Sequence, residues 1–321
     1  MNLAQTNWEI MACPKCQGHL EPDEAGSGIV CSGCRTEYVI ENGIPRFVPR
    51  ENYTGSFGFQ WNRHKRTQLD KFNGLSISRD RLLGQSRWSA ADLDGMLVLE
   101  CGSGAGRFSQ VLLDHNAELY SIDYSDAVEA NYQNNGESDH LHLFQASIYE
   151  LPFKEESFDR LICLGVIQHT PDVEATFKAM FRYLKKGGKF CIDVYAAPHS
   201  YLHPRHLIRP FTRNMDPEKL YRIVEKVVPW MLPLSTALHR IPLIGQVLAR
   251  LIPVANWRAN LPLKDETMWK EWAVLDTFDW LSPAYESPQS AKTLEAWCRS
   301  LDLGHFEVIR ERGLYVVRGT K

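Results

Sequence analysis

Short apolar runs alternate with segments of helical periodicity through the middle of the chain. The runs predict buried strands over residues 96–99, 119–122, 141–146, 157–165 and 189–195. Before the last run, apolar side chains recur every three or four residues and predict a helix that Gly187 and Gly188 end; these positions are Val173, Phe177, Met180, Phe181 and Leu184. Strands that alternate with helices predict an α/β fold, with a parallel sheet and helices on both of its faces.

The segment from about residue 199 to 285 departs from this alternation. Residues 199–262 hold eight of the seventeen prolines, so we expect short helices broken at turns there. The same residues carry nine basic and three acidic side chains, and residues 227–257 are strongly apolar. We expect a helical lid whose apolar face packs on the core. There are two alternatives. One is an interfacial segment that reaches a lipid-linked substrate at a membrane surface, and the other is an oligomer interface.

Aromatic side chains and carboxylates gather at the end of this segment. Asp276 and Asp279 lie among five aromatic residues, which are Trp269, Trp272, Phe278, Trp280 and Tyr285. Aromatic rings with interspersed carboxylates suit a pocket for a sugar or an aromatic acceptor, although core packing is the default explanation.

Composition narrows the class of protein. The 321 residues correspond to roughly two domains, and 44% hydrophobic residues suffice for a sizeable core. The net charge of -3 gives no general attraction to nucleic acid. No apolar run reaches the ~18 residues of a membrane-spanning helix, and the first residues lack the pattern of a signal peptide. We therefore expect a cytoplasmic protein, with peripheral contact to the inner face of a membrane through residues 199–262 as an option.

Four of the eight cysteines form two Cys-x-x-Cys pairs near the N-terminus, namely Cys13, Cys16, Cys31 and Cys34. Each pair can aim two thiolates at one point, and two pairs complete a closed tetrahedral zinc site. Four cysteines leave no coordination position open for water, so the zinc would be structural and would supply folding energy to a segment too small for its own core. Two disulfides are the alternative, but nothing in the sequence suggests export.

The strands and turns around these cysteines resemble the zinc-ribbon activator subunit that partners several eukaryotic methyltransferases, and similar ribbons fused to bacterial methyltransferases. The resemblance covers about the first fifty residues. Six acidic side chains against four basic ones make this ribbon a poor clamp for phosphates.

The first strand runs directly into a glycine-rich loop, residues 100–106. Alternate glycines let the backbone turn sharply and approach a ligand at the carboxyl end of the strand. Such a loop alone leaves dinucleotides and other nucleoside ligands equally open. Asp123 ends the next strand and is placed to bind ribose hydroxyls, whereas Glu100 at the end of the first strand is unusual for a nicotinamide enzyme.

At these residues the chain resembles the class I S-adenosylmethionine-dependent methyltransferases, and in particular those of methyltransferase type 11. The resemblance covers about residues 95–195 and 293–320, and it includes the family's closing antiparallel strand pair over 306–311 and 314–318. It implies a Rossmann-like sheet, S-adenosylmethionine as the cofactor and methyl transfer as the reaction.

The resemblance also implies a cofactor site. Glu100 would lie near the methionyl amino group, Asp123 would bind the ribose and Tyr124 would lie against the adenine. Ser147 stands where the family often has an Asp, and its hydroxyl can still form hydrogen bonds. The full set is Glu100, Gly102, Ser103, Gly104, Gly106, Asp123, Tyr124, Ser147, Ile148 and Leu164. Residues 57–64 would fold over the cofactor or form a linker helix that docks the ribbon.

Three residues are candidates for catalysis. In-line methyl transfer needs alignment and exclusion of water, and it needs a base only where the acceptor loses a proton. His169 follows the fourth strand, where the family faces the methyl group, and it is equally suited to fixing the loop before the helix cap at Asp172. Tyr195 and His199 follow the fifth strand and can line a pocket.

We therefore expect a zinc ribbon over residues 1–50 and a methyltransferase domain over 51–321, with its core at about 95–198 and 286–321 and a helical insertion at about 199–285. The expected reaction is methylation, at oxygen, of a small-molecule, glycan or lipid-linked acceptor. An RNA methyltransferase is the alternative, because large-subunit rRNA guanine methyltransferases also join a zinc module to this core. A non-catalytic partner subunit is the third hypothesis.

Overall fold

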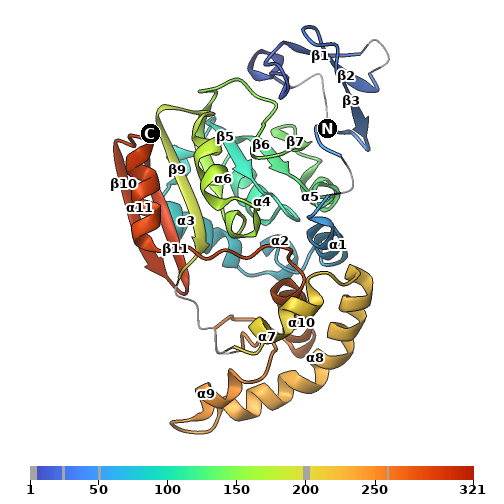
Figure 1. The fold of residues 1–321 in the computed structure, drawn as a ribbon, viewed down its shortest axis with the longest axis vertical. Helices are drawn as coiled ribbons and strands as arrows, with labels where there is room; N and C mark the ends of the chain where they lie inside the picture. The colour runs from blue at the N-terminus through green and yellow to red at the C-terminus, as the bar shows by residue number, and fades with distance from the viewer. Residues whose placement is uncertain (1–5, 24–25, 50–51, 198–202, 259) are drawn as a thin grey trace.

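A seven-stranded sheet lies at the centre of the computed structural model, which describes residues 6–23, 26–49, 52–197, 203–258 and 260–321 (Figure 1). The strand order is β10-β11-β9-β8-β5-β6-β7. Strands β5 to β9 are parallel, and β11 is antiparallel to both of its neighbours. The strands are β5 (Leu97–Cys101), β6 (Glu118–Asp123), β7 (Leu141–Gln145), β8 (Phe158–Cys163), β9 (Leu184–Tyr195), β10 (His305–Glu311) and β11 (Leu314–Thr320).

The strand order reverses at β5, which pairs with β6 on one side and with β8 on the other. Because these strands are parallel, their carboxyl ends meet at one edge of the sheet, where open α/β sheets bind ligands. This order confirms the predicted Rossmann-like sheet, including its closing antiparallel pair.

Helices cover both faces of the sheet, because successive residues of a strand point to opposite sides. On one face Val98 clusters with Phe108 of α4, and on the other face Leu99 clusters with Phe177 of α6. The first face carries α3 (Ile77–Ser86), α4 (Arg107–Asp114) and α5 (Val128–Asn135), and the second carries α6 (Val173–Phe181) and α11 (Ala291–Ser300).

One boundary differs from the prediction. Helix α6 ends at Phe181, and Gly187 and Gly188 lie inside β9 instead of ending a helix. Leu184 is fully buried and pairs with Phe158 of β8, so that packing into the sheet overrides helical periodicity at this position.

The N-terminal ribbon is a second, antiparallel sheet with the order β1-β2-β3-β4. Its strands are β1 (Leu20–Pro22), β2 (Gly28–Cys31), β3 (Glu37–Glu41) and β4 (Ile44–Pro45). The ribbon lies against the β7 edge of the large sheet, where the Phe47 N–H donates to the Gln145 carbonyl at 2.8 Å. Met11 belongs to the same buried apolar cluster as Phe153 of the core, so ribbon and core share one hydrophobic interior.

Four helices form the lid that follows β9, namely α7 (Arg205–Thr212), α8 (Pro217–His239), α9 (Gly245–Ala249) and α10 (Glu266–Leu281). The expectation of short helices is wrong for α8, which continues through Pro229 and Pro233. Its buried side chains form one stripe that packs with α10, and this packing outweighs the hydrogen bonds that the prolines remove; the stripe is Leu220, Tyr221, Val224, Val228 and Leu232. Among the described helices, none combines the length and the apolar character that crossing a membrane demands.

Helix α1 (Gly55–Arg63) joins the lid to the core, and the short α2 (Asp70–Asn73) follows it. Phe59 of α1 packs on Tyr221 of α8 and on Phe278 of α10. On its other side, the Asn62 amide donates to the Asp126 carbonyl at 2.9 Å. The lid is therefore anchored through α1 as well as through its own connections to the sheet.

Candidate functional site

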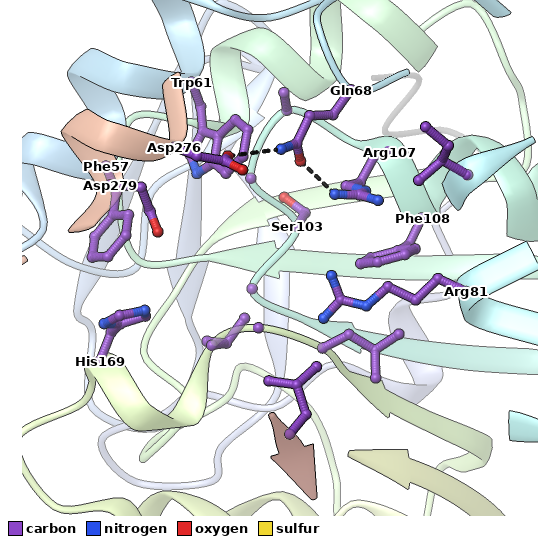
Figure 2. A pocket seen from close by; sticks show the side chains of 18 of the residues that line it. Phe57, Trp61, Gln68, Arg81, Ser103, Arg107, Phe108, His169, Asp276 and Asp279 are labelled. Carbon is purple, nitrogen blue, oxygen red and sulfur yellow. Dashed lines mark hydrogen bonds between the residues drawn. The ribbon is translucent and has the colours of Figure 1, made fainter. Parts of the chain in front are cut away.

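A cavity of about 1550 Å³ opens at the carboxyl ends of the parallel strands. Its walls come from the glycine-rich loop after β5, from α1, from the loops after β6 and β8, and from the lid. Figure 2 shows Phe57 and Trp61 of α1 near Asp279 and Asp276 of the lid, with Ser103 of the glycine-rich loop across from them. Sites for one small molecule usually measure ~300–1,000 Å³, so this cavity has room for two ligands side by side. Phe57 and Trp61, from the segment expected to fold over the cofactor or to dock the ribbon, line this cavity.

The glycine-rich loop depends on residues without side chains. Gly102 has φ +83°, and a Cβ atom there would lie 2.3 Å from Val166. Gly106 has φ +85°, and a Cβ atom there would lie 2.1 Å from the Asn131 side chain. Both the left-handed backbone and the close neighbours exclude larger residues, and they keep the loop backbone open to a ligand.

Eight of the ten expected cofactor residues line the cavity, namely Gly102, Ser103, Gly104, Asp123, Tyr124, Ser147, Ile148 and Leu164. The Asp123 carboxylate accepts hydrogen bonds from the Gly104 and Ser125 N–H groups, both at 2.8 Å, and burial raises its pKa. The Ser103 hydroxyl is buried in the wall, and the described part of the chain offers it no hydrogen-bond partner. A buried polar group of this kind fits a site that a polar ligand completes.

Glu100 and Gly106, the other two expected residues, do not line the cavity. The Glu100 carboxylate lies behind the loop and accepts hydrogen bonds from the hydroxyls of Ser109 (2.5 Å) and Ser121 (2.7 Å). Burial raises the pKa of Glu100 to about 7. Both hydrogen bonds go to Oε2, and Oε1 is buried without a hydrogen-bond partner among the described residues, so the expected contact of Glu100 with a methionyl amino group stays a prediction. Gly106 is the N-cap of α4.

His169 lies in a buried turn after β8 and lines the cavity. Its Nδ1 is 3.0 Å from the Tyr285 carbonyl, which can only accept, so Nδ1 carries the proton in this contact. The ring contacts both Phe57 and Tyr195, with centroid distances of 5.2 and 5.5 Å. Nε2 of a neutral His169 is consequently the nitrogen with a lone pair.

Tyr195 ends β9 and also lines the cavity. Burial raises the pKa of its phenol well above the usual value, so the hydroxyl keeps its proton and can donate a hydrogen bond. His199, the third catalytic candidate, lies outside the described residues.

The sequence did not suggest the ion pair of Arg81, which lines the cavity, with Asp193 behind it. The Arg81 guanidinium of α3 donates to the fully buried Asp193 carboxylate of β9 at 2.6 Å, and the Gly165 N–H donates to the other Asp193 oxygen at 2.5 Å. Both carboxylate oxygens of Asp193 are therefore occupied by contacts within the chain. Arg81 lines the cavity, but its partner lies 112 positions away and no local pattern marks it.

Two carboxylates of α10 enter the cavity, as Figure 2 shows for Asp276 and Asp279. The Gln60 amide donates to Asp279 at 3.2 Å, and the Trp257 indole N–H donates to Asp276. Burial raises the pKa of both carboxyls, that of Asp276 to about 7. The aromatic residues of the predicted pocket that share this lining are Trp272 and Trp280.

Gln68 connects the lid to the helix after the glycine-rich loop. Its amide lies 3.4 Å from an Asp276 oxygen, and its carbonyl accepts from the Arg107 guanidinium (Figure 2). Burial lowers the pKa of Arg107 to about 9. The two walls of the cavity are thus joined by polar contacts as well as by packing.

The four N-terminal cysteines converge on one point. Their sulfur atoms lie within 4.8 Å of one another, with 3.7 Å between Cys13 and Cys34 and 3.4 Å between Cys16 and Cys31. A tetrahedral zinc with Zn–S bonds of about 2.3 Å holds its sulfurs roughly 3.8 Å apart. These separations exceed a disulfide bond of about 2.05 Å, so the arrangement fits a metal and not the alternative of disulfides.

Comparison with protein families identifies both parts of the chain. A model described as a methyltransferase domain matches residues 99–192, which contain the glycine-rich loop, Asp123 and His169. Residues 99–192 are a methyltransferase domain. A second model, described as Trm112p-like protein, matches residues 8–43. These matches confirm the predicted methyltransferase core and the zinc-ribbon N-terminus.

Relatives with assigned activities match about a third of the chain. The chain is 30% identical to the ubiquinone biosynthesis O-methyltransferase of Coxiella burnetii over 99 residues, which are 30% of this chain and 42% of that protein. It is 31% identical to the enzyme of the same name from Pseudomonas fluorescens over 118 residues, 35% of this chain and 50% of that one. The chain thus spans about half the length of these relatives or less.

Solved structures resemble the chain at low identity. A Methanococcus maripaludis protein assigned as an S-adenosyl-L-methionine-dependent methyltransferase aligns with 85% of this chain and 96% of its own, at TM-score 0.46 and 12% identity. A complex of the Haloferax volcanii Trm112 methyltransferase activator aligns with 46% of this chain and 62% of its own, at TM-score 0.36 and 22% identity.

Proposed function

We propose that the protein is an S-adenosylmethionine-dependent methyltransferase that methylates an oxygen atom of a small-molecule, glycan or lipid-linked acceptor. The observation that carries this proposal is one cavity that joins the glycine-rich loop and Asp123 to His169 and the carboxylates of the lid. In-line displacement needs two ligands aligned in a single site from which water is excluded. S-adenosylmethionine, when bound, supplies the activated methyl group. The O-methyltransferases among the relatives support oxygen as the acceptor atom.

His169 is the proposed general base. A hydroxyl acceptor must lose its proton during attack on the methyl group, and His169 can take that proton at Nε2 because Nδ1 is held by the Tyr285 carbonyl. The rings of Phe57 and Tyr195 both pack against the imidazole and help to fix its orientation. Fixed orientation matters because proton transfer requires a hydrogen bond of ordinary length to the acceptor hydroxyl.

The lid side of the cavity suits an acceptor with several hydroxyl groups. Asp276 and Asp279 can accept hydrogen bonds, and burial raises the pKa of both carboxyls. With its pKa raised to about 7, Asp276 can also donate a hydrogen bond near neutral pH. Trp272 and Trp280 add aromatic surface beside them. Carboxyl groups next to indole rings recognise a sugar or a polyhydroxylated ring through its hydroxyls and its apolar face.

Zn²⁺ bound by Cys13, Cys16, Cys31 and Cys34 would be structural. The four thiolates fill a tetrahedral site, so the metal has no position for a substrate or for water. The chemistry of this donor set supports zinc, and the site lies in the ribbon, whose residues are not among those that line the cavity. The proposed reaction therefore does not involve the metal.

The test separates cofactor binding from catalysis. Calorimetry should show S-adenosylmethionine binding to the protein, and Asp123→Ala should weaken it at least about tenfold because a ribose contact is lost. Transfer of a labelled methyl group to a panel of phenols and sugars should fall ~10²–10⁴-fold in His169→Asn, with cofactor affinity unchanged. Unchanged S-adenosylmethionine binding in Asp123→Ala would refute the assigned cofactor site. Full turnover in His169→Asn would refute His169 as the general base.

A further inference from the structure

Exposed apolar side chains concentrate on the lid. Of the fourteen large hydrophobic residues exposed in the described part of the chain, eleven lie between residues 207 and 251. Helices α7, α8 and α9 carry most of them, and Figure 1 shows α8 and α9 as the part of the lid farthest from the sheet. We call the eleven the outer face of the lid; they are Leu207, Phe211, Ile223, Val227, Trp230, Leu234, Ile241, Leu243, Ile244, Val247 and Leu251.

Helix α8 carries two separate apolar stripes. One is buried against α10, and the other is exposed and recurs at Ile223, Val227, Trp230 and Leu234. At about 100° per residue, the exposed stripe lies roughly 115° around the helix from the buried one. The exposed stripe therefore faces away from the packing with α10, and its most exposed member, Trp230, is 82% exposed.

Leu243, in the turn between α8 and α9, is a further apolar residue without packing partners in the described part of the chain. Its side chain is fully exposed, and its φ of +67° is a left-handed conformation that disfavours a leucine. Neither packing within the chain nor backbone preference accounts for a leucine at this position. A surface that buries Leu243 from outside would account for it.

Basic side chains flank the outer face. Lys219 and Lys226 lie on α8 beside the exposed stripe, and Arg240 and Arg250 lie on either side of the turn that holds Leu243. All four are exposed, and within the described ranges no carboxylate forms an ion pair with any of them. Apolar side chains flanked by unpaired cations are complementary to an anionic lipid surface. The apolar side chains can insert among the acyl chains, and the cations can bind the headgroup phosphates.

The same lid elements line the cavity from the inside. Arg205 of α7 and Asp279 and Trp280 of α10 belong to the cavity wall, while the outer residues of α7 and α8 face away from it. We propose that the outer face of the lid docks on an anionic lipid bilayer, and that the cavity takes its acceptor from that surface. The second part rests on the proposed methyltransferase function. It specifies the acceptor as an amphiphile with a polar, hydroxylated head that enters the cavity and an apolar tail that stays in the bilayer.

Vesicle co-sedimentation of the full chain tests the docking. The protein should sediment with vesicles of phosphatidylcholine and phosphatidylglycerol and much less with phosphatidylcholine alone. The double variant Trp230→Gln, Leu243→Asn should lower the partition coefficient about tenfold or more, and Asn tolerates the left-handed backbone at residue 243. Lys219→Glu with Lys226→Glu should lose the preference for anionic vesicles. The matched controls are Val39→Asn on the ribbon and Lys292→Glu on α11, which should bind like the parent.

The outcomes separate the two proposals. Docking is overturned if the parent ignores anionic vesicles, if the lid variants bind as well as the parent, or if light scattering shows that the outer face joins two copies in solution. Calorimetry with S-adenosylmethionine should give the same affinity for parent and lid variants. Vesicle binding without cofactor binding would retain the docking surface and refute the methyltransferase function instead.

Discussion

The ribbon and the lid lie against the same methyltransferase domain but treat their apolar side chains in opposite ways. The ribbon places Met11, Ile29 and Tyr38 in one buried cluster with the core of the sheet. The lid buries one stripe of α8 and leaves eleven large apolar side chains exposed. In the described part of the ribbon only Val39 is a large, exposed apolar side chain, whereas the lid exposes a broad apolar surface of the kind that binding partners often cover.

The difference follows from what each part needs in order to fold. The ribbon is too small for an independent core, so it depends on four thiolates and on the edge of β7. The lid has its own apolar cluster, made by α8 and α10, and can leave further side chains free for another task. Exposed apolar residues on the lid are therefore not a sign of poor packing.

Loss of the metal should have the largest effect, because zinc binding in small domains contributes roughly 10–16 kcal/mol. We expect Cys16→Ser to lose zinc and to unfold the ribbon while the sheet remains folded. Metal analysis and limited proteolysis between residues 13 and 47 measure the two effects. Cys298→Ser, at a buried cysteine of α11, is the control and should keep one zinc per chain. A Cys16→Ser protein with full zinc content and an intact ribbon would contradict the assignment.

Arg46→Ala tests how firmly the ribbon is docked. Arg46 is nearly buried, pairs with Glu129 of α5 and donates to the Gln145 side chain at 3.1 Å. Removing one partner of a largely buried pair should lower the free energy of unfolding by about 3 kcal/mol, measured by urea titration. Arg182→Ala breaks an exposed pair with Glu155 and should cost ~0–1 kcal/mol. Equal losses in the two variants would mean that the Arg46 contact does not hold the ribbon.

Asp276→Asn tests the inner side of the lid through pH. Burial raises the pKa of Asp276 to about 7, so between pH 4 and pH 7 the folded state holds a proton that the unfolded state releases. Stability therefore falls as pH rises through this window, and the neutral amide should remove that loss. Relative to the parent, the variant should gain about 3 kcal/mol between pH 4.5 and pH 8, as measured by urea unfolding at both values. Asp302→Asn, at an exposed carboxylate, is the control, and the same gain there would refute the assignment.

The two regions also differ in how far their sequences predicted them. Cys13 and Cys16, with their distant pair, specify a metal site by spacing alone, and the loop at Gly102 specifies a ligand site by its glycines. Local chemistry of this kind is visible in one stretch of chain. Arg81 and Asp193 form their pair across 112 positions, and only the folded sheet brings them together. The lid was correctly predicted to be helical, but the prolines wrongly predicted only short helices. In α8, tertiary packing outweighed the local propensity of Pro229 and Pro233 to end a helix.

Pro229→Ala should have the smallest effect on stability. It tests whether packing keeps α8 helical despite its prolines. Pro229 is exposed in the interior of the helix and removes one backbone hydrogen bond, so alanine should stabilise the lid by about 1–2 kcal/mol after the entropy gained by the unfolded chain is subtracted. Pro217→Ala is the matched control in the same helix, because Pro217 stands at the first position, where no hydrogen bond is lost and alanine should cost ~0.4–1 kcal/mol. Thermal unfolding followed by helical circular dichroism measures both changes. If both substitutions destabilise the protein equally, packing does not hold α8 in a helix at Pro229. The exposed stripe of the outer face, which depends on helical spacing, would then not exist.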